Sequence, residues 1–506
     1  MTLIKLISDT LAMGKQALVF VNTKRGAEKA AEELAHSIRN VQLTELSAEI
    51  LHALSKPTKQ CERLARTIEK GIAFHHAGLV QKQRELIEDN FRTGDIKIIC
   101  ATPTLAMGVD LPAFRSILKD LKRYGHRGLE YIPVLEYMQM AGRAGRPKFD
   151  SYGEAICIAT SEAQKDELIE RYLKGDPEDI FSKLAVEPVL RMYVLSLLAA
   201  GFVRTKKQLF DFFSKTFFAH QFEDLGKINA LIEKILQLLE EWEFITSSGS
   251  QDFTSALDLG NEHYKTSLMG KRVAELYIDP LTAHEFVLCL QKAASMKTTD
   301  FSFLQMVSSS LEMRPQLKMR VKESEEIQQE LMKNEEFLLA GEPSLYDYEY
   351  DSFLDSIKTT LFFSEWIDEK DEEYLLERFN IRPGEIRVKL DIADWLLYTS
   401  EELVKILNFK PLIKDLSKLR IRIQNGVKEE LIPLLKFEQV GRVRARILFR
   451  NGIKDVADVK KADFSTMVSL LGKNVAIIVK KQVGQDFAKI EVKENKRKGQ
   501  ISLRDY

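Results

Sequence analysis

The sequence has few cysteines, and none of them stand at metal-binding spacing. Its four cysteines, Cys61, Cys100, Cys157 and Cys289, are far apart and never form CxxC. A zinc site needs grouped sulfur or imidazole ligands, and a disulfide framework needs several cysteines in a short chain. We therefore expect no metal site and no disulfide, and we expect the cysteines to be buried apolar side chains.

Long hydrophobic runs are also missing. Of 506 residues 45% are hydrophobic, yet the longest apolar runs fall short of the ~18 residues that a membrane span requires. The start, MTLIKLISDTLAMGKQ, lacks a signal-peptide cleavage pattern and is typical of an amphipathic helix. These features predict a cytoplasmic protein with no membrane partner, and the length suggests roughly three to five domains.

A phosphate-binding loop of the GxxxxGK[ST] type is absent, as is an acidic strand end of the Walker B type. What the sequence does contain is QMAGRAGRP at 139–147, where Arg143 and Arg146 stand three apart among small residues. Two permanently charged guanidinium groups directed at one polyanion favour a nucleoside triphosphate site. The sequence thus carries one half of such a site without the other.

Charge is distributed unevenly along the chain. The formal net charge is −1, but residues 410–506 contain 23 Lys and Arg against 11 Asp and Glu, which leaves −13 elsewhere. A basic C-terminal module on an otherwise acidic chain indicates a polyanionic partner.

The first ~175 residues alternate β-rich runs with helical stretches, which predicts an α/β domain with a parallel sheet covered by helices. The expected strands are 17–22, 96–102, 116–121 and 154–160. Loops at the carboxyl ends of such strands are where α/β sheets bind ligands.

Beyond residue 180 the pattern becomes helical, with expected helices at 187–202, 208–220 and 228–245. A hairpin signal follows at 245–259, so these elements resemble a winged helix ending near Tyr277. The next segment, 282–408, is nearly all helix, interrupted by the acidic, aromatic GEPSLYDYEYDSF, which is most simply a solvated loop.

Four motifs resemble those of a known family. VFVNTKRGAEKAAEEL, GIAFHHAGL, FRTGDIKIICATPTLAMGVDLPA and QMAGRAGRP are similar, in order and spacing, to motifs IV to VI of superfamily-two helicases. The residues of GVDLPA and QMAGRAGRP resemble the corresponding motifs of the Ski-type branch of these helicases. The helical remainder and basic tail are most similar to the archaeal Hjm-type DNA helicases, relatives of the polymerase-theta helicase.

The resemblance covers essentially the whole chain but begins after the point where the first RecA-like domain of the family ends. It implies a multidomain α/β plus mostly α architecture. The implied parts are a second RecA-like domain at 1–178, a winged helix at 179–278, a helical ratchet domain at 279–408, a helix-hairpin-helix domain at 409–488 and a basic tail at 489–506.

The resemblance also implies roles at the nucleotide site. Arg143 and Arg146 are expected to point at the γ-phosphate, with Arg146 as the arginine finger, and Gln139 to couple nucleotide to nucleic acid. Asp110 is expected to contact the ribose, and Gly108 fits a tight turn before Val109.

Thr102 and Thr104 are expected to hold a nucleic-acid phosphate without reading a base. The alternative is that Thr102 and Asp110 merely cap the following segment. His75 and His76 are adjacent, so their side chains diverge, and no further ligand is suitably spaced for a metal. We expect them to contact DNA or to have a structural role.

Between motifs V and VI, LKDLKRYGHRGLEYIPVLEY has two β-capable arms around a tip with Tyr124, His126 and Arg127. In the Hjm-type helicases a hairpin here splits the duplex. An aromatic ring stacked on a terminal base would contribute ~1 to 3 kcal/mol, comparable to one base-pair step. The alternative is an ordinary exposed hairpin.

The helix expected at 382–400 resembles the ratchet helix that grips single-stranded DNA. The usual basic position, seven residues before Trp395, is occupied by Val388, so Arg387 or Lys389 would have to substitute for it. A tryptophan buried in the core is an equally good interpretation of Trp395.

FEQVGRVRARILFRNGI, at 437–453, resembles a helix-hairpin-helix that binds a DNA phosphate through Gly441 and the charges of Arg442 and Arg444. Gln439 replaces the usual first hairpin glycine. LLGKNVAIIVKK, at 470–481, is a weaker second copy.

The sequence is therefore identified as the C-terminal portion of a 3′ to 5′ DNA helicase that acts on forked or junction DNA in replication-linked repair and recombination. Expected cofactors are ATP and Mg²⁺, held mostly by the absent first RecA-like domain, so this chain alone is expected to lack ATPase activity. Expected partners are single-stranded and branched DNA and replication or repair proteins, with the chain a monomer. The alternatives are a Ski-type RNA helicase portion and a non-catalytic DNA-binding or regulatory protein.

Overall fold

The computed structural model describes residues 2–38, 42–54, 56–125, 128–146, 150–222, 226–248 and 263–486. The chain divides into two compact units, each with its own packing. The first comprises 1–240, 246–265 and 371–389, and the second 241–245, 266–370 and 390–506.

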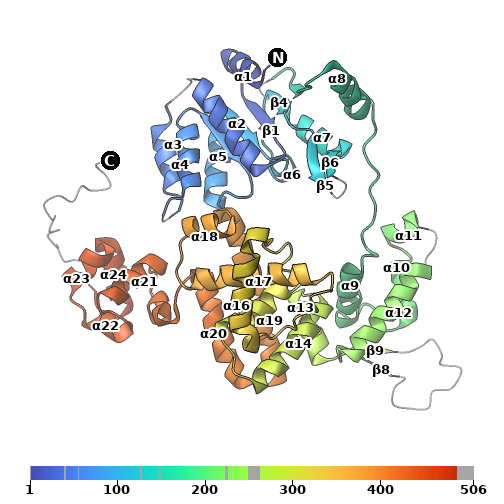
Figure 1. Cartoon of the computed structure of the whole chain (residues 1–506), viewed down its shortest axis with the longest axis vertical. Coiled ribbons are helices and arrows are strands. Elements are labelled where there is room, and N and C mark those ends of the chain that lie inside the picture. Colours follow the sequence, from blue (N-terminus) through green and yellow to red (C-terminus); the bar gives the residue numbers. More distant parts are fainter. Residues whose placement is uncertain are drawn as a thin grey trace. The chain divides into compact units, whose positions relative to one another are not determined.

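A five-stranded parallel sheet forms the centre of the first unit (Figure 1). Its strand order is β2-β3-β1-β4-β7, and its bounds are β1 Ala17–Phe20, β2 Ile72–His75, β3 Ile98–Ala101, β4 Arg115–Leu118 and β7 Glu154–Cys157. The strands β1 to β4 of this sheet are buried at every position. β1 and β3 are wholly apolar, as expected where helices cover both faces of a parallel sheet, whereas β4 begins with Arg115 and Ser116 and β2 ends with His75.

The four expected strands are confirmed, each shorter than predicted. The fifth strand, β2, was not predicted, because His75 and His76 break its short apolar run IAF. It places His75 at the same edge of the sheet as the end of β3, where Ala101 is its register partner. The pairing of β2 with β3 therefore places the motif GIAFHHAGL beside the ATPT segment of the next motif, although α5 lies between them in the sequence.

The helices around the sheet include the amphipathic helix predicted at the start of the chain, α1. Thr23 begins α2 by accepting a hydrogen bond from the backbone of Gly26, and Gly94 ends α5 with a φ of 89°. The bounds are α1 Leu3–Ala12, α2 Lys24–Ser37, α3 Thr44–Leu51, α4 Lys59–Ile68, α5 Gln81–Thr93, α6 Thr104–Gly108, α7 Val134–Ala141, α8 Glu162–Leu168 and the π-helix Ile169–Leu173.

The next region contains α9 Glu187–Ala199, α10 Lys206–Phe213, α11 Phe217–Gln221, α12 Gly226–Glu241, β8 Ile245–Ser247, β9 Tyr264–Thr266 and α13 Leu268–Leu276. The single helix predicted at 208–220 is wrong, since the structure has two. The hydroxyls of Ser214 and Thr216 donate to the backbone carbonyls of Asp211 and Phe213, and such local bonds compete with the helix.

The expected hairpin after α12 is present as the pair β8–β9, but its second strand begins later than predicted. Residues 249–262, which include most of the predicted turn, lie outside the described residues. The basic tail at 489–506 also lies outside them.

The remaining part of the chain is helical, as predicted for 282–408. Its helices are α14 Pro280–Ser295, α15 Asp300–Ser309, α16 Ser324–Asn334, α17 Tyr350–Ile367, α18 Glu372–Phe379, α19 Pro383–Leu407 and α20 Lys410–Asn425, with 3-10 turns at Val321–Glu323 and Glu335–Phe337. The acidic, aromatic segment is non-helical up to Tyr350, and Tyr346 and Tyr348 are exposed, which confirms a solvated loop there.

A separate hydrophobic core joins the last helices, which are the 3-10 helix Glu429–Lys436 followed by α21 Arg442–Arg450, α22 Val456–Lys461, α23 Phe464–Leu471 and α24 Lys473–Gln482. Of the cysteines, Cys61, Cys100 and Cys289 are buried as expected, whereas Cys157 is half-buried. Within the described ranges, no helix is long and apolar enough to cross a membrane.

Candidate nucleotide and nucleic-acid site

Arg143 lies in the loop after α7 and contacts the segment around α6. Its Nε donates to the backbone carbonyl of Ala106 at 3.1 Å, and Nη2 donates to the same oxygen. Its Nη1 lies 3.2 Å from Oδ1 of Asp110. The structure therefore brings two of the predicted nucleotide-site residues, Arg143 and Asp110, into direct contact.

Arg146 is more firmly held than Arg143. Its Nε lies 2.7 Å from Oδ2 of Asp150, and its Nη1 donates to Oε1 of Gln16 at 2.6 Å. Lys15 also pairs with Asp150. The hydrogen bond from Arg146, with that from Lys15, outweighs burial and lowers the pKa of Asp150 to about 2.

The two arginines differ in how easily a phosphate could replace their carboxylates. The Asp110 side chain is 93% exposed, whereas the Asp150 side chain is 1% exposed. A buried carboxylate that loses its partner carries a larger desolvation penalty than an exposed one. Arg143 is therefore the more easily released of the pair.

Backbone hydrogen bonds hold the arginine loop in place. Ala113 N donates to the carbonyl of Arg143 at 2.9 Å, and Gly145 N donates to the carbonyl of Ala113 at 2.7 Å. Gly145 has a φ of 92°. Gly153 packs so closely on the backbone of Gly145 that a side chain at Gly153 would not fit. These backbone hydrogen bonds and the close glycine contact fix the loop that carries Arg143 and Arg146.

Gln139 and Gly108, the other two residues predicted for the nucleotide site, do not take part in the ion pair between Arg143 and Asp110. Gln139 is exposed on α7. Gly108 is the last residue of α6, its φ is not positive, and a side chain would meet nothing within 4 Å. The expected tight turn at Gly108 therefore does not require glycine on steric grounds.

Thr102 and Thr104 lie at the carboxyl end of β3. Their hydroxyls are 2.9 Å apart, and Thr102 N donates to the carbonyl of His75 at 3.2 Å. The capping alternative does not hold for Thr102, because the residue before α6 is Pro103 and no side chain caps the helix. Thr104 is exposed, so the hydroxyl pair reaches solvent at one end.

His75 and His76 are buried, and both bind carboxylates of the same domain. Nε2 of His75 lies 3.0 Å from Glu88, and Nε2 of His76 lies 3.2 Å from Glu28. These contacts favour the structural role over the DNA contact. Across the residues that the structure describes, no cluster of three metal-ligating side chains occurs.

The hairpin expected between motifs V and VI is confirmed. Strands β5 Lys122–Gly125 and β6 Gly128–Tyr131 are antiparallel, with Tyr124 opposite Leu129. Tyr124 is 86% exposed. The tip residues His126 and Arg127 lie outside the described residues.

Trp395 on α19 is half-buried, and its indole Nε1 donates to the carbonyl of Leu276 at 3.0 Å. Arg387 is exposed and pairs with Glu372 at 2.9 Å. Lys389, the other possible substitute at the basic position, is buried, and burial lowers its pKa. Arg387 is thus the basic side chain of the two that reaches solvent.

The hairpin before α21 has a left-handed residue where glycine is usual. Gln439 has a φ of 61°, and its carbonyl accepts a hydrogen bond from Arg444 at 2.8 Å. Gly441 precedes the first turn of α21. Arg442 donates to the carbonyl of Lys370 at 2.7 Å, so it already serves an intramolecular contact, whereas Arg444 is exposed.

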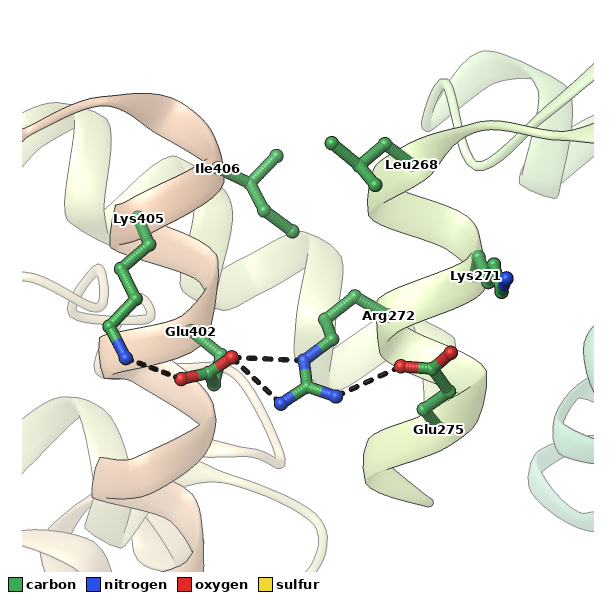
Figure 2. Close-up of a pocket in the computed structure, with 7 residues that line it drawn as sticks. All are labelled: Leu268, Lys271, Arg272, Glu275, Glu402, Lys405 and Ile406. Atoms are coloured by element: carbon green, nitrogen blue, oxygen red, sulfur yellow. Dashed lines mark hydrogen bonds and ion pairs between the residues drawn. The ribbon is translucent and has the colours of Figure 1, made fainter.

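An open hollow of about 430 Å³ lies within the second unit between α13 and α19 (Figure 2). Arg272 crosses it, with Glu275 at 2.9 Å and Glu402 at 2.7 Å, and Lys405 pairs with Glu402 at 2.6 Å. Leu268 and Ile406 line its apolar end. None of the residues that line the hollow belongs to the four motifs described above, so we assign it no role in nucleotide binding.

Several contacts in the site were not predicted from the sequence. Gln16 and Asp150, which hold Arg146, lie 130 and 4 residues from it. Glu28 and Arg382 meet across 354 residues. No local spacing could have revealed the long-range pairs, although Asp150 stands one helical turn from Arg146.

Comparison with known proteins agrees with this geometry. Residues 1–148 match the family described as the helicase conserved C-terminal domain, and residues 301–426 match the archaeal helicase, domain 4. The parallel sheet with its arginine loop is thus the RecA-like C-terminal domain of a helicase.

Three relatives are each described as the ATP-dependent DNA helicase Hel308. That of Pyrococcus abyssi is 38% identical over 98% of this chain and 67% of its own length. Those of Pyrococcus horikoshii and Methanococcus vannielii are 37% and 36% identical, over 98% and 93% of this chain and 67% and 66% of their own lengths. The chain belongs to the Hel308 family, and it spans about two thirds of the length of these relatives.

Proposed function

We propose that this chain is the C-terminal part of an ATP-dependent DNA helicase that moves 3′ to 5′ on single-stranded DNA and unwinds forks or junctions. The observation that carries this proposal is the alignment with Hel308 helicases over 98% of the chain. The contact between Arg143 and Asp110 supports it, since it gathers two family motifs at one edge of the sheet.

The arginine loop fits a nucleotide phosphate. Arg143 and Arg146 are guanidinium groups on one loop, and phosphate oxygens would replace the exposed Asp110 at Arg143 more easily than the buried Asp150 at Arg146. They would hold the terminal phosphate and stabilise its charge during transfer. Mg²⁺ and the remaining phosphates would be held by a first RecA-like domain, so this chain alone would hydrolyse little or no ATP.

DNA would be bound by separate parts of the chain. Thr102 and Thr104 would contact the phosphate backbone of the DNA. Tyr124 would stack on the terminal base pair at the fork, and Trp395 with Arg387 would grip the single strand. Arg444 and the amide after Gly441 would contact a phosphate. The domain limits proposed for this arrangement are a winged helix at 179–278, a ratchet domain at 279–408 and a helix-hairpin-helix domain at 409–488.

The test is ATPase activity of this chain with and without single-stranded DNA, together with DNA binding across a salt series. We expect salt-dependent binding without turnover, because the phosphate contacts release counterions. Turnover stimulated by DNA would contradict the proposed division of the nucleotide site. Loss of binding at every salt concentration would contradict the proposed DNA contacts.

A competition experiment addresses the nucleic acid. Unlabelled RNA of the same sequence should displace the bound DNA less effectively than unlabelled DNA does. Equal or better displacement by RNA would favour a Ski-type RNA helicase instead. Sedimentation of the free chain is expected to give a monomer.

A further inference from the structure

The turn before α19 packs against the motif loop after β2. Gly384 N donates to the carbonyl of Gly78 at 3.0 Å. A side chain at Gly384 would meet the carbonyls of Ala77 and Leu79, and one at Gly78 would meet the Arg382 side chain. The backbone of the loop thus leaves no room for a side chain at Gly384, and the Arg382 side chain fills the space beside Gly78.

Glu28 lies at the centre of this contact. Its side chain is 4% exposed and accepts from Nε2 of His76 at 3.2 Å, Nε of Arg382 at 3.3 Å, Nη1 of Arg63 at 2.7 Å and Gln60 at 2.9 Å. Burial would raise the pKa of Glu28, but the hydrogen bonds and the Arg382 charge lower it to about 2. The carboxylate is therefore charged and links four segments of the chain.

Ion pairs at the surface surround the buried contact. Lys24 pairs with Glu385, Lys56 lies 2.5 Å from Asp371, and Lys59 lies 2.5 Å from Glu377. Each such pair is weak alone because water screens it. Together they connect α2, the segment before α4 and the start of α4 with α18 and the first turn of α19, all within the first unit.

The contact joins the sheet edge to a long helix. Thr102 N donates to the carbonyl of His75, and His76 binds Glu28, which binds Arg382. Arg382 precedes α19, an uninterrupted helix of 25 residues that also carries Trp395. Residues 371–389 fall inside the range matched as domain 4, yet they pack with the sheet domain.

We propose that Arg382, held by Glu28, which His76 also binds, is a positioning residue that couples the nucleotide-binding domain to α19. This rests on the proposed helicase function. When the sheet domain moves with the nucleotide, the first turn of α19 moves with it, and the hydrogen bonds of a continuous helix carry the displacement toward Trp395. Arg382 touches neither nucleotide nor DNA in this role.

The test uses the complete helicase with Arg382→Gln, with Arg92→Gln as the matched control. Arg92 is a surface arginine of the same domain, paired only with carboxylates of its own helix among the described residues. We expect DNA-stimulated ATPase and single-strand affinity to be retained in Arg382→Gln. The base pairs unwound per ATP hydrolysed should fall roughly 2- to 30-fold, which is the effect of losing a coupling contact.

A double variant separates coupling from simple damage. Glu28→Gln should lower the same ratio, and Glu28→Gln with Arg382→Gln should be no worse than the larger single effect, because both remove one link. Equal proportional loss of ATPase and unwinding, or an unchanged ratio, would overturn the proposal. A wild-type enzyme that does not unwind DNA would instead refute the proposed function.

If the thermal midpoint shows that Arg382→Gln does not fold, a variant of the surface pair Lys24 and Glu385 is measured instead. The measured quantity is again the number of base pairs unwound per ATP hydrolysed. Lys24→Gln removes a partly exposed side chain and should lower the ratio by a smaller factor. An unchanged ratio in a folded Lys24→Gln variant, with Arg382→Gln unfolded, would count against the proposal.

Discussion

The Arg143 guanidinium joins Asp110 at 3.2 Å while it donates to the backbone of Ala106, so one side chain connects the loop after α7 to the segment after α6. Arg146, three residues later, is bound to a buried carboxylate instead. The two arginines of one motif therefore bind carboxylates of very different exposure. Substitutions of the two arginines should for this reason differ in their effect on stability.

In the complete helicase, Arg143→Gln and Arg146→Gln should each lower kcat for ATP by ~10³-fold or more, since both stabilise charge on the transferred phosphoryl group. Their stabilities should differ. Arg143→Gln leaves an exposed carboxylate and removes the hydrogen bonds to the Ala106 carbonyl, so it should lower Tm less than Arg146→Gln. Arg146→Gln removes a hydrogen-bonding partner from the buried Asp150 side chain and should cost about 1 to 3 kcal/mol. Steady-state kinetics and thermal melts test this. Equal Tm values for both variants would contradict it.

Tyr124→Ala in the complete helicase should uncouple unwinding from ATP hydrolysis, because the exposed ring at the hairpin would no longer stack on the terminal base pair. The expected loss corresponds to ~1 to 3 kcal/mol per stacked base. Tyr346→Ala is the control, since Tyr346 is also almost fully exposed but lies in the acidic loop. Fork unwinding and ATPase are measured together, and an equal loss of both activities would argue against the wedge role.

Two substitutions distinguish the hydrogen bond that Trp395 makes from the DNA contact that we propose for it. Trp395→Phe keeps an aromatic face but loses the hydrogen bond to Leu276, which should cost about 1 kcal/mol of stability. Trp395→Ala should also weaken binding of single-stranded DNA by ~1 to 3 kcal/mol. Fluorescence titration measures the affinity and denaturant unfolding the stability. If Trp395→Ala binds DNA as tightly as the native chain, Trp395 has only a core role.

Gln439→Gly should stabilise the C-terminal helices by ~1 kcal/mol, because Gln439 has a φ of 61° and a Cβ is unfavourable in that conformation. Gln439→Ala is the control, which retains the Cβ and should bring no gain. Thermal unfolding of the whole chain compares the three. A gain in the alanine variant as large as in the glycine variant would show that the side chain and not the backbone is responsible.

Acid should weaken the Glu28 contact in a defined range of pH. The pKa of Glu28 is about 2 in the folded chain against an ordinary 4.5, so its contribution is complete above 4.5 and is lost as pH falls toward 2. The difference in unfolding free energy between the native chain and Glu28→Gln should therefore shrink over this range, by about 3 kcal/mol at most. Urea midpoints at pH 5, 4 and 3 measure it. A constant difference would contradict the lowered pKa.

Much of the first domain could be predicted from sequence because its signals are local. Apolar runs such as ALVF, capping by Thr23 and the small residues around Arg143 each depend on neighbours in the chain. The strand β2 was missed because His75 and His76 break its short apolar run IAF. The helix predicted at 208–220 is two helices because the hydroxyls of Ser214 and Thr216 bond to backbone carbonyls and compete with the helix.

The sequence by itself determined the family, the parallel sheet, the hairpin with Tyr124 and the arginine motif, since these depend on residue type and spacing. Only the tertiary structure decided that Arg146 is bound to buried Asp150, that Gln439 takes the left-handed conformation, and that Glu28 meets Arg382. The reason is that pairs separated by up to 354 residues leave no periodic trace in the chain. Burial, which sets the strength of each pair, exists only after the chain has folded.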